Sequence, residues 1–285
     1  YANAKTYIDM VLNSGQYELE SDFKYVWSEN NKYGKEMIFA LLHETGNNAA
    51  EIACHFGPSD HPEVPGRWQY YGVSLPFWRS YDKEDPRREF FYYDYTGDAK
   101  RDDQSDYGFH YMVPEEGVTV VPNDTTKYMQ NVATMKYTYD MISDAYYDGR
   151  TICIFRLSDV ILCKAEIENN LNGPAAALPY LNQIRARAGA PEYGKHNRFP
   201  APSTKETMND AILKERGYEL VFEFQRRADL IRFGKYEEVV NAHLKKLGIA
   251  QPTNVTSSLR YFPYPLNDAQ LNPNLAAENP SRLPK

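Results

Sequence analysis

The segment 155–189, FRLSDVILCKAEIENNLNGPAAALPYLNQIRARAG, carries the start and stop signals of two consecutive helices. Ser158 or Asp159 can cap the first helix, Gly173 can end it, and Pro174 suits the first turn of the second. A helical hairpin of about 35 residues has the size of a tetratricopeptide unit. One such unit cannot bury its apolar face alone, so further helices must pack against it.

The sequence divides into three zones of different composition. Residues 1–56 read as a helix followed by a short strand, and residues 57–150 are rich in Pro, Gly, Asp, Tyr and Trp, which predicts long loops with short strands. Residues 151–285 are mostly helical, and we expect further helices at 206–225 and 235–247. The pattern therefore predicts a mostly α fold with a loop-rich, short-strand subdomain.

The two ends of the sequence have distinct patterns. YANAKTYIDMVLNSG reads as helix from Tyr1, with Tyr7 and Leu12 on its apolar side and no capping residue ahead of it. We therefore expect a fragment whose natural N-terminus, with any leader or lipid anchor, lies upstream. The tail 261–280 contains two Asn-Pro steps, which favour an extended wrap over the surface rather than a helix.

The charge balance limits the classes of partner. The formal net charge is −7, the pI is near 5.5, and no run of Lys and Arg occurs. These values argue against nucleic acid or an anionic membrane surface as the main partner and accommodate a neutral ligand. Cys54, Cys153 and Cys163 form no CxxC pair and read as small buried residues. No apolar run approaches the roughly 18 residues of a membrane-spanning helix.

A row of charged residues lies in the segment 212–235, ILKERGYELVFEFQRRADLIRFGK. Glutamates four residues apart form one stripe on a helix of about 3.6 residues per turn. The residues of this row are Glu215, Arg216, Glu219, Glu223, Arg226 and Asp229. We interpret them as a structural ion-pair cluster. The cations expected to hold Glu219 and Glu223 are Arg185, Arg216, Arg226 or Arg227.

Two catalytic interpretations compete with this one. A di-metal site would place His three residues after each Glu, but Tyr218, Phe222 and Arg226 stand there. A glycoside hydrolase needs two carboxyls roughly 5 to 9.5 Å apart, one of them with a raised pKa. Neighbouring arginines lower a carboxyl pKa instead. A glycan-hydrolysing enzyme therefore remains as an alternative, and the structural interpretation is preferred.

Large aromatic side chains gather in the stretch GRWQYYG. A sugar ring stacks its apolar C–H face on an aromatic plane, and its hydroxyls bind polar groups at the edge. The candidate ligand-binding residues are Arg67, Trp68, Gln69, Tyr70 and Tyr71. The alternative is that these rings only seal the loop-rich zone. In that case Tyr107, Tyr146 and Tyr147 are the next candidates.

No cofactor is predicted. The histidines form no HExxH, and the sequence contains no Walker loop, GxGxxG or GxSxG. The acidic stretch 94–106, DYTGDAKRDDQSD, lacks the alternating Asp-x-Asp-x-Asp-Gly of a calcium loop. We expect a solvated loop there, with adventitious calcium binding as the alternative.

Four ordered stretches resemble the motifs of the SusD/RagB family of nutrient-binding outer-membrane lipoproteins. They are RLSDVILCKAE (156–166), LNQIRARAG (181–189), ERGYELVFEFQRRADLIR (215–232) and NPNLAAENP (272–280). KEMIFAL and DPR, further upstream, also match family landmarks, so the resemblance covers nearly the whole chain. One departure is Phe224, where the family usually has Gly, and we expect this ring to be buried.

The resemblance implies both a fold and a function. The fold is a single SusD-like domain over 1–285, a helical superhelix with four tetratricopeptide-like pairs, lacking its N-terminal part. Such proteins capture glycans or other oligomers outside the cell without catalysis, on the outer membrane, and lie as a lid on a SusC-like TonB-dependent transporter. Their lipid anchor sits on an N-terminal cysteine absent from this sequence. A peptide ligand is the alternative within the family.

Overall fold

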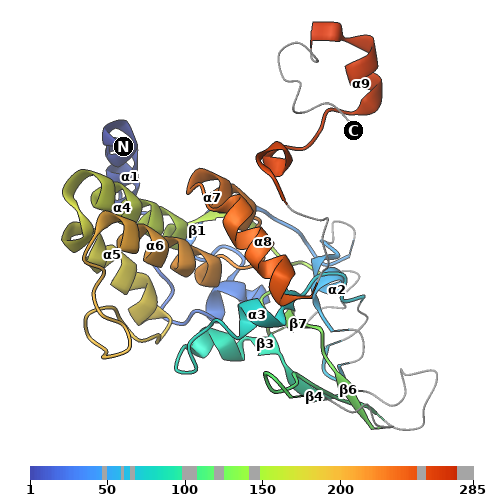
Figure 1. The fold of residues 1–285 in the computed structure, drawn as a ribbon. Helices are drawn as coiled ribbons and strands as arrows, with labels where there is room; N and C mark the ends of the chain where they lie inside the picture. The colour runs from blue at the N-terminus through green and yellow to red at the C-terminus, as the bar shows by residue number, and fades with distance from the viewer. Residues whose placement is uncertain are drawn as a thin grey trace. The chain divides into compact units, whose positions relative to one another are not determined.

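The computed structural model describes residues 1–46, 50–58, 61–64, 68–97, 108–118, 125–140, 148–248 and 255–274. The chain forms two compact units, a larger unit of residues 1–223 and a smaller unit of residues 224–285. Both are drawn in Figure 1, and each is described by itself.

A layer of packed helices forms one part of the larger unit (Figure 1). Its members are α1 (Ala2–Asn13), α4 (Leu157–Asn172), α5 (Pro174–Arg187) and α6 (Lys205–Glu219). Helix α4 contacts the other three, and α5 also contacts α6. Gly173 joins α4 to α5 with a φ of 91°, a conformation that favours glycine, and Pro174 opens α5. The predicted helical hairpin is therefore present, and α1 and α6 cover it.

Helix α4 starts earlier than the sequence pattern predicted. Arg156 occupies the N-cap position with extended backbone, and no side chain caps the helix. The prediction that Ser158 or Asp159 is the cap is therefore wrong. The physical reason is that the preceding strand runs directly into the helix and leaves no turn to be capped. Ser158 and Asp159 lie buried inside the first turn instead.

Helix α6 ends at Glu219, so the helix predicted for 206–225 is too long at its C-terminal end. Thr204 and Thr207 form a capping box at its start. Beyond its end, Phe222 and Phe224 have φ values of 60° and 63°, which no right-handed helix contains. Glu223 therefore does not continue the helical stripe, and a tight turn places it.

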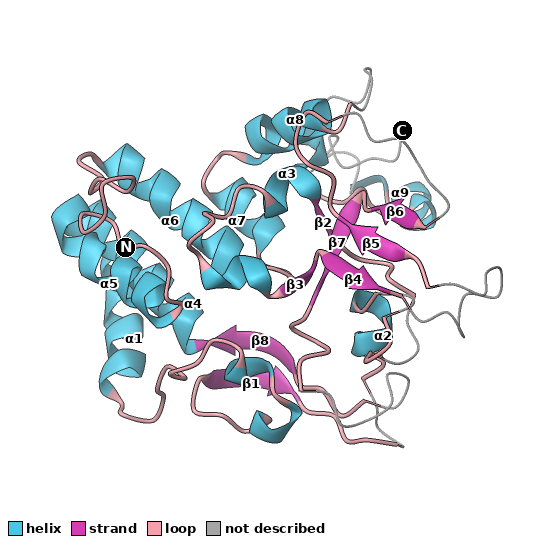
Figure 2. Cartoon of the chain, turned by 90° about the horizontal axis from the view of Figure 1, so that it is seen from below, coloured by secondary structure: helices cyan, strands magenta, loops and turns pink. Residues whose placement is uncertain are grey.

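Short strands form three small sheets (Figure 2), and two of the three lie within 57–150, where short strands were expected. Strand β1 (Met37–Leu41) pairs antiparallel with β8 (Ile152–Arg156). The second sheet has the order β2 (Val73–Ser74), β7 (Asn131–Thr134) and β3 (Phe91–Tyr92). The third has the order β4 (Asp94–Thr96), β5 (His110–Met112) and β6 (Thr126–Tyr128). The same part of the chain also contains α2 (Ile52–Phe56), α3 (Leu75–Trp78) and the 3-10 turns Tyr25–Trp27, Glu29–Asn31 and Pro86–Glu89.

Aromatic side chains build much of the core around these sheets. One cluster includes Trp27, whose ring meets that of Tyr137 edge to face at 5.9 Å. A second includes Trp78 and Tyr81, and the Tyr81 ring stacks on Tyr218 at 4.2 Å. Because aromatic rings bury large areas, such clusters stabilise a region with few aliphatic residues. Several tyrosines of the chain therefore serve to pack the core.

The smaller unit contains α7 (Arg226–Arg232), α8 (Tyr236–Lys246), the 3-10 turn Ser257–Arg260 and α9 (Leu266–Leu271). The tail expected to be fully extended thus contains a short helix, because its two Asn-Pro steps begin only at Asn272, after α9 ends. Phe224 is 67% exposed, so the prediction that it is buried is wrong. Its backbone is left-handed, with a φ of 63°, a conformation that glycine adopts without steric cost.

None of the helices in the described ranges is both long and apolar enough to cross a membrane.

Candidate functional site

The aromatic stretch predicted to bind ligand lies alongside helix α2. The Trp68 N–H donates to the Cys54 carbonyl at 2.7 Å, and the Tyr71 N–H donates to the His55 carbonyl at 3.2 Å. Two backbone hydrogen bonds therefore fix residues 68–71 against one turn of helix. A loop held in this way presents its side chains at low entropic cost.

Four rings form a surface that we call the aromatic platform: His55, Trp68, Tyr70 and Tyr71. The rings of Trp68 and Tyr70 are 5.4 Å apart at an interplanar angle of 30°. The His55 ring contacts all three others, at centroid distances of 5.1, 5.5 and 6.4 Å. Trp68, Tyr70 and Tyr71 are 39%, 65% and 54% exposed. A ligand can therefore reach these rings, unlike those of the core clusters.

A polar edge adjoins the platform. Gln69 has a φ of 45°, and its side-chain amide donates to the Asn131 Oδ1 atom at 3.3 Å. Gly72 comes so close to Asn131 that an added Cβ would lie 2.2 Å from the same oxygen. The strand β7 thus anchors the segment through Asn131, and the two amides place hydrogen-bonding groups beside the rings.

The structure brings together four of the five predicted ligand-binding residues, and it adds two that sequence reasoning missed. Arg67 lies outside the described residues, as do Tyr107, Tyr146 and Tyr147 and most of the acidic stretch 94–106. His55 and Asn131 are far from the stretch in sequence, and no local signal links either to it.

The glutamate row lies in a different place, inside the larger unit. Its centre is Arg156, which is fully buried and contacts Glu36 at 2.5 Å, Glu219 at 2.7 Å and Glu223 at 2.7 Å. Arg87 contacts Glu215 at 2.7 Å and Glu219 at 2.9 Å. The carboxylates therefore share cations that come from distant parts of the chain.

We call the full set the buried ion-pair cluster. Its anions are Glu36, Asp85, Glu215, Glu219 and Glu223. Its cations are Arg87, Lys136, Arg156, Arg185 and Arg187. Five negative groups face five positive groups, so the cluster is neutral as a whole. Neutrality matters because an unpaired charge buried in a protein costs several kcal/mol.

The cations found on Glu219 and Glu223 differ from those expected. Glu219 binds Arg87, Arg156 and Arg187, and Glu223 binds Arg156 and Lys136. Of the four arginines expected to hold them, Arg185 binds Glu215 instead. Arg216 binds Asp159 at 2.7 Å, and Arg226 and Arg227 belong to the smaller unit. There, Asp229 pairs with Arg232 at 3.0 Å.

The electrostatics of the cluster suit charge pairing. Burial alone would raise the pKa of Glu219, but the charges of Arg187, Arg156 and Arg87 outweigh it and hold that pKa well below its usual range. Glu223 shifts in the same direction for the same reasons, with Arg156 and Lys136 as its cations. Burial lowers the pKa of Lys136 to about 8. A general acid for glycoside cleavage needs a raised carboxyl pKa, so these carboxyls are unsuited to that role.

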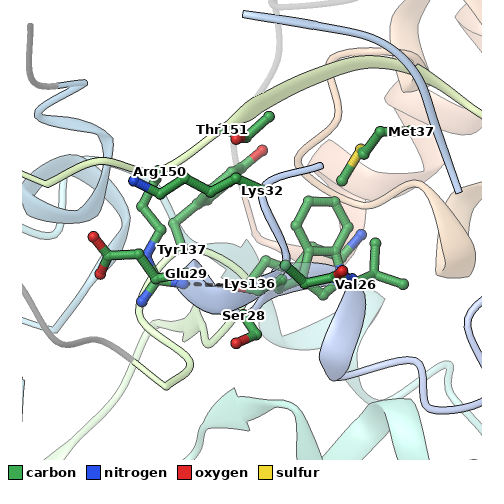
Figure 3. A pocket seen from close by; sticks show the side chains of 11 residues that line it. Val26, Ser28, Glu29, Lys32, Met37, Lys136, Tyr137, Arg150 and Thr151 are labelled. Atoms are coloured by element: carbon green, nitrogen blue, oxygen red, sulfur yellow. Dashed lines mark hydrogen bonds between the residues drawn. The ribbon is translucent and has the colours of Figure 1, made fainter. Parts of the chain in front are cut away.

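A small pocket lies next to the cluster, and Figure 3 shows Glu29, Lys136 and Arg150 among the side chains that line it. Its volume is about 10 Å³. That space accommodates about one water molecule and is too small for a sugar ring.

The described ranges contain no group of three or more His, Cys, Asp and Glu side chains placed to hold a metal ion. Asp94, at the start of the acidic stretch, contacts the His110 ring at 2.6 Å.

Comparison with known proteins places this fold. A family model described as the SusD family matches residues 35–281. The chain belongs to the SusD family. The SusD-like protein P38 of Formosa agariphila is 26% identical over 262 residues, which are 84% of this chain and 50% of that protein. The starch-binding protein SusD of Bacteroides thetaiotaomicron is 28% identical over 137 residues, covering 47% of this chain and 22% of that protein.

Solved SusD structures share the architecture. A SusD homolog from Bacteroides thetaiotaomicron superimposes with a TM-score of 0.71 at 25% identity, covering 95% of this chain and 57% of that chain. The surface glycan-binding protein A of Bacteroides thetaiotaomicron, solved with laminarihexaose, gives a TM-score of 0.63 at 20% identity over 93% of this chain and 56% of that one. The expected mostly α, SusD-like fold is therefore confirmed. The chain spans about half the length of these proteins.

Proposed function

We propose that this protein binds a glycan without catalysis and that the aromatic platform is its binding surface. The observation that carries the proposal is the exposure of Trp68, Tyr70 and Tyr71 on a segment fixed by backbone hydrogen bonds. Support comes from two relatives, one named for starch binding and one solved with laminarihexaose.

The chemistry of the platform fits a neutral sugar. An exposed aromatic face stacks on the C–H face of a sugar ring, and the amides of Gln69 and Asn131 bind hydroxyls at its edge. Stacking on such a face contributes about 1 to 3 kcal/mol, by analogy with the stacking of bases. A chain with a net charge of −7 is a poor match for nucleic acid, the other common ligand of aromatic platforms.

The placement of the carboxyls supports the proposed absence of catalysis. Glu215, Glu219 and Glu223 are buried at 3% exposure or less and pair with arginines, and neighbouring cations hold the pKa values of Glu219 and Glu223 below their usual range. Their burial argues against contact with a glycan. Within the proposed function, their role is to hold the fold together.

The proposal includes the cellular setting that the family resemblance implies. The protein works on the outer membrane, at its extracellular face, through an N-terminal lipid anchor, and delivers the glycan to a SusC-like TonB-dependent transporter. Co-purification of such a transporter with the membrane-anchored, full-length protein tests this part. A protein recovered from the periplasm or cytoplasm would contradict it.

The test of glycan binding is the variant Trp68→Ala. A glycan array that also carries peptides first identifies the ligand, and calorimetry then measures its affinity. We expect Trp68→Ala to weaken binding about ten- to a hundredfold, the equivalent of one lost stacking contact, at a nearly unchanged melting temperature. Tyr33→Ala is the matched control because Tyr33 is exposed but lies outside the platform.

Three results would contradict the proposal. A loss of stability of several kcal/mol in Trp68→Ala with affinity intact would assign Trp68 to the core. Binding of peptides and no glycan would change the ligand class. Release of shorter sugars during incubation with oligosaccharides would show catalysis.

A further inference from the structure

A second concave site lies in the larger unit, away from the platform segment. It is a groove of about 490 Å³ between the C-terminal part of α1, the residues that follow it, and the helices α4 and α5. Ligand pockets in proteins have volumes of about 300 to 1,000 Å³. The groove is therefore large enough for a small ligand, unlike the small pocket beside the ion-pair cluster.

The lining combines apolar and aromatic surface with neutral polar groups. Leu157 and Ile161 are buried and supply the apolar part, and Tyr17 and Tyr180 supply two rings. The amide of Asn13 also lines the groove. This mixture of rings and amides has the chemistry by which proteins bind sugars.

The acidic groups of the groove already have cations. Asp9 contacts Lys5 at 2.5 Å and is also held by Lys164. Glu18 contacts Lys35 at 3.2 Å. Because both carboxylates are paired, a positively charged ligand would have to displace an existing partner. The charge of the groove therefore favours a neutral occupant.

Neutral polar groups remain available at the same place. Within the parts of the chain that the structure describes, no hydrogen bond to protein engages the side chains of Asn13, Tyr17 or Gln183. Asn13 and Gln183 are exposed, so their amides can turn toward a ligand. Each amide offers both donors and an acceptor, which matches a pair of adjacent sugar hydroxyls.

We propose that this groove is a second binding site for neutral oligosaccharide, formed by α1, α4 and α5. The ligand class rests on the proposed function, but the site does not depend on the aromatic platform. Tyr180 supplies the stacking surface, and Asn13 and Gln183 bind hydroxyls. Two separate sites let one chain hold two stretches of a polymer, which raises the overall affinity without new contacts at either site.

Calorimetry with the glycan identified on the array tests this inference, with Trp68→Ala, Tyr180→Ala, Gln183→Ala and the double variant Trp68→Ala/Tyr180→Ala. Wild type should bind at two sites, and Trp68→Ala should weaken one of them about ten- to a hundredfold while the other keeps its affinity. Tyr180→Ala should weaken the second site about tenfold or more, and the double variant should show both losses. Gln183→Ala is expected to weaken the second site about three- to tenfold. Since Gln183 is exposed, this variant folds even where Tyr180→Ala does not.

The controls separate this proposal from the proposed function. Gln16→Ala changes an exposed glutamine outside the groove lining and should bind as wild type does. One site in wild type, abolished by Trp68→Ala, would overturn the groove site and leave the platform standing. A second outcome would also overturn the groove site: Tyr180→Ala and Gln183→Ala lower the melting temperature but leave the number of bound glycans per chain unchanged. The groove would then be a surface on which further polypeptide packs. If no glycan binds wild type, the proposed function itself fails.

Discussion

The substitution Glu219→Gln tests the buried ion-pair cluster directly. Glu219 is fully buried and contacts Arg87, Arg156 and Arg187. Glutamine keeps the size of the side chain and removes its negative charge. The cluster then holds five cations and four anions, and the excess positive charge has no access to water.

The magnitude follows from the cost of an uncompensated buried charge. Removing one partner of a buried ion pair costs about 3 to 5 kcal/mol, a large part of a typical unfolding free energy of about 5 to 15 kcal/mol. Urea denaturation at neutral pH measures the loss as a lower transition midpoint at unchanged slope. Glu206→Gln is the matched control. It lies on the same helix but is exposed, and it should cost less than about 1 kcal/mol.

The pH dependence provides a second readout. The folded-state pKa of Glu219 is depressed below the ordinary value of 4.5. Its contribution to stability is therefore fully present above pH 4.5 and is lost as the pH falls toward the folded-state pKa. The difference in unfolding free energy between wild type and Glu219→Gln should shrink below pH 4.5. A variant of wild-type stability that lost a hydrolytic activity would refute the structural role.

Two further predictions concern the backbone and the cluster lysine. Phe224→Gly should stabilise the protein by about 0.5 to 1 kcal/mol, because glycine relieves the left-handed strain and an exposed ring is lost. Phe222 has a similar φ, but its ring packs 5.0 Å from that of Phe56, so Phe222→Gly should destabilise the protein by about 2 kcal/mol or more. Destabilisation by both variants in thermal melts would contradict this reasoning. Lys136 has a pKa of about 8, below its ordinary 10.5, so the unfolded state binds more protons between these values. The unfolding free energy of wild type relative to Lys136→Met should therefore rise from pH 8 to 10.5 by at most about 1.4 kcal/mol per pH unit. Parallel curves of unfolding free energy against pH for the two proteins would contradict this prediction.

The helical part of the fold was predictable because its signals are local. Gly173 and Pro174 mark the turn between α4 and α5 within two residues, and the structure has the turn there. The end of α6 was not predictable in this way. The apolar and charged periodicity runs on past Glu219, while the left-handed backbone of Phe222 and Phe224 has no signature in the two side chains. The expectation that Phe224 is buried considered the volume of its ring, whereas the structure shows that the backbone φ is the special property of this position.

The candidate site was likewise predictable only in part. The aromatic stretch is visible in the sequence because its rings are neighbours in the chain. His55 joins them only because backbone hydrogen bonds hold the stretch against α2. Asn131 joins through Gln69, again across a long interval. Sequence reasoning therefore finds the part of a site that one segment supplies, and tertiary contacts supply the remainder.

The ion-pair cluster connects the short strands of the loop-rich zone to the helices of the larger unit. Arg87 lies in the 3-10 turn before β3, Lys136 follows β7, and Arg156 joins β8 to α4. All three side chains meet the carboxylates at the end of α6 and in the turn beyond it. The cluster therefore ties the short strands to the helical layer by charge at points outside the loops themselves. Within the described residues, 68–71 make none of these contacts, so under the proposed function they can change to suit another ligand while the frame stays fixed. Loss of Glu219 should consequently lower stability and leave the affinity of the folded protein for its ligand unchanged.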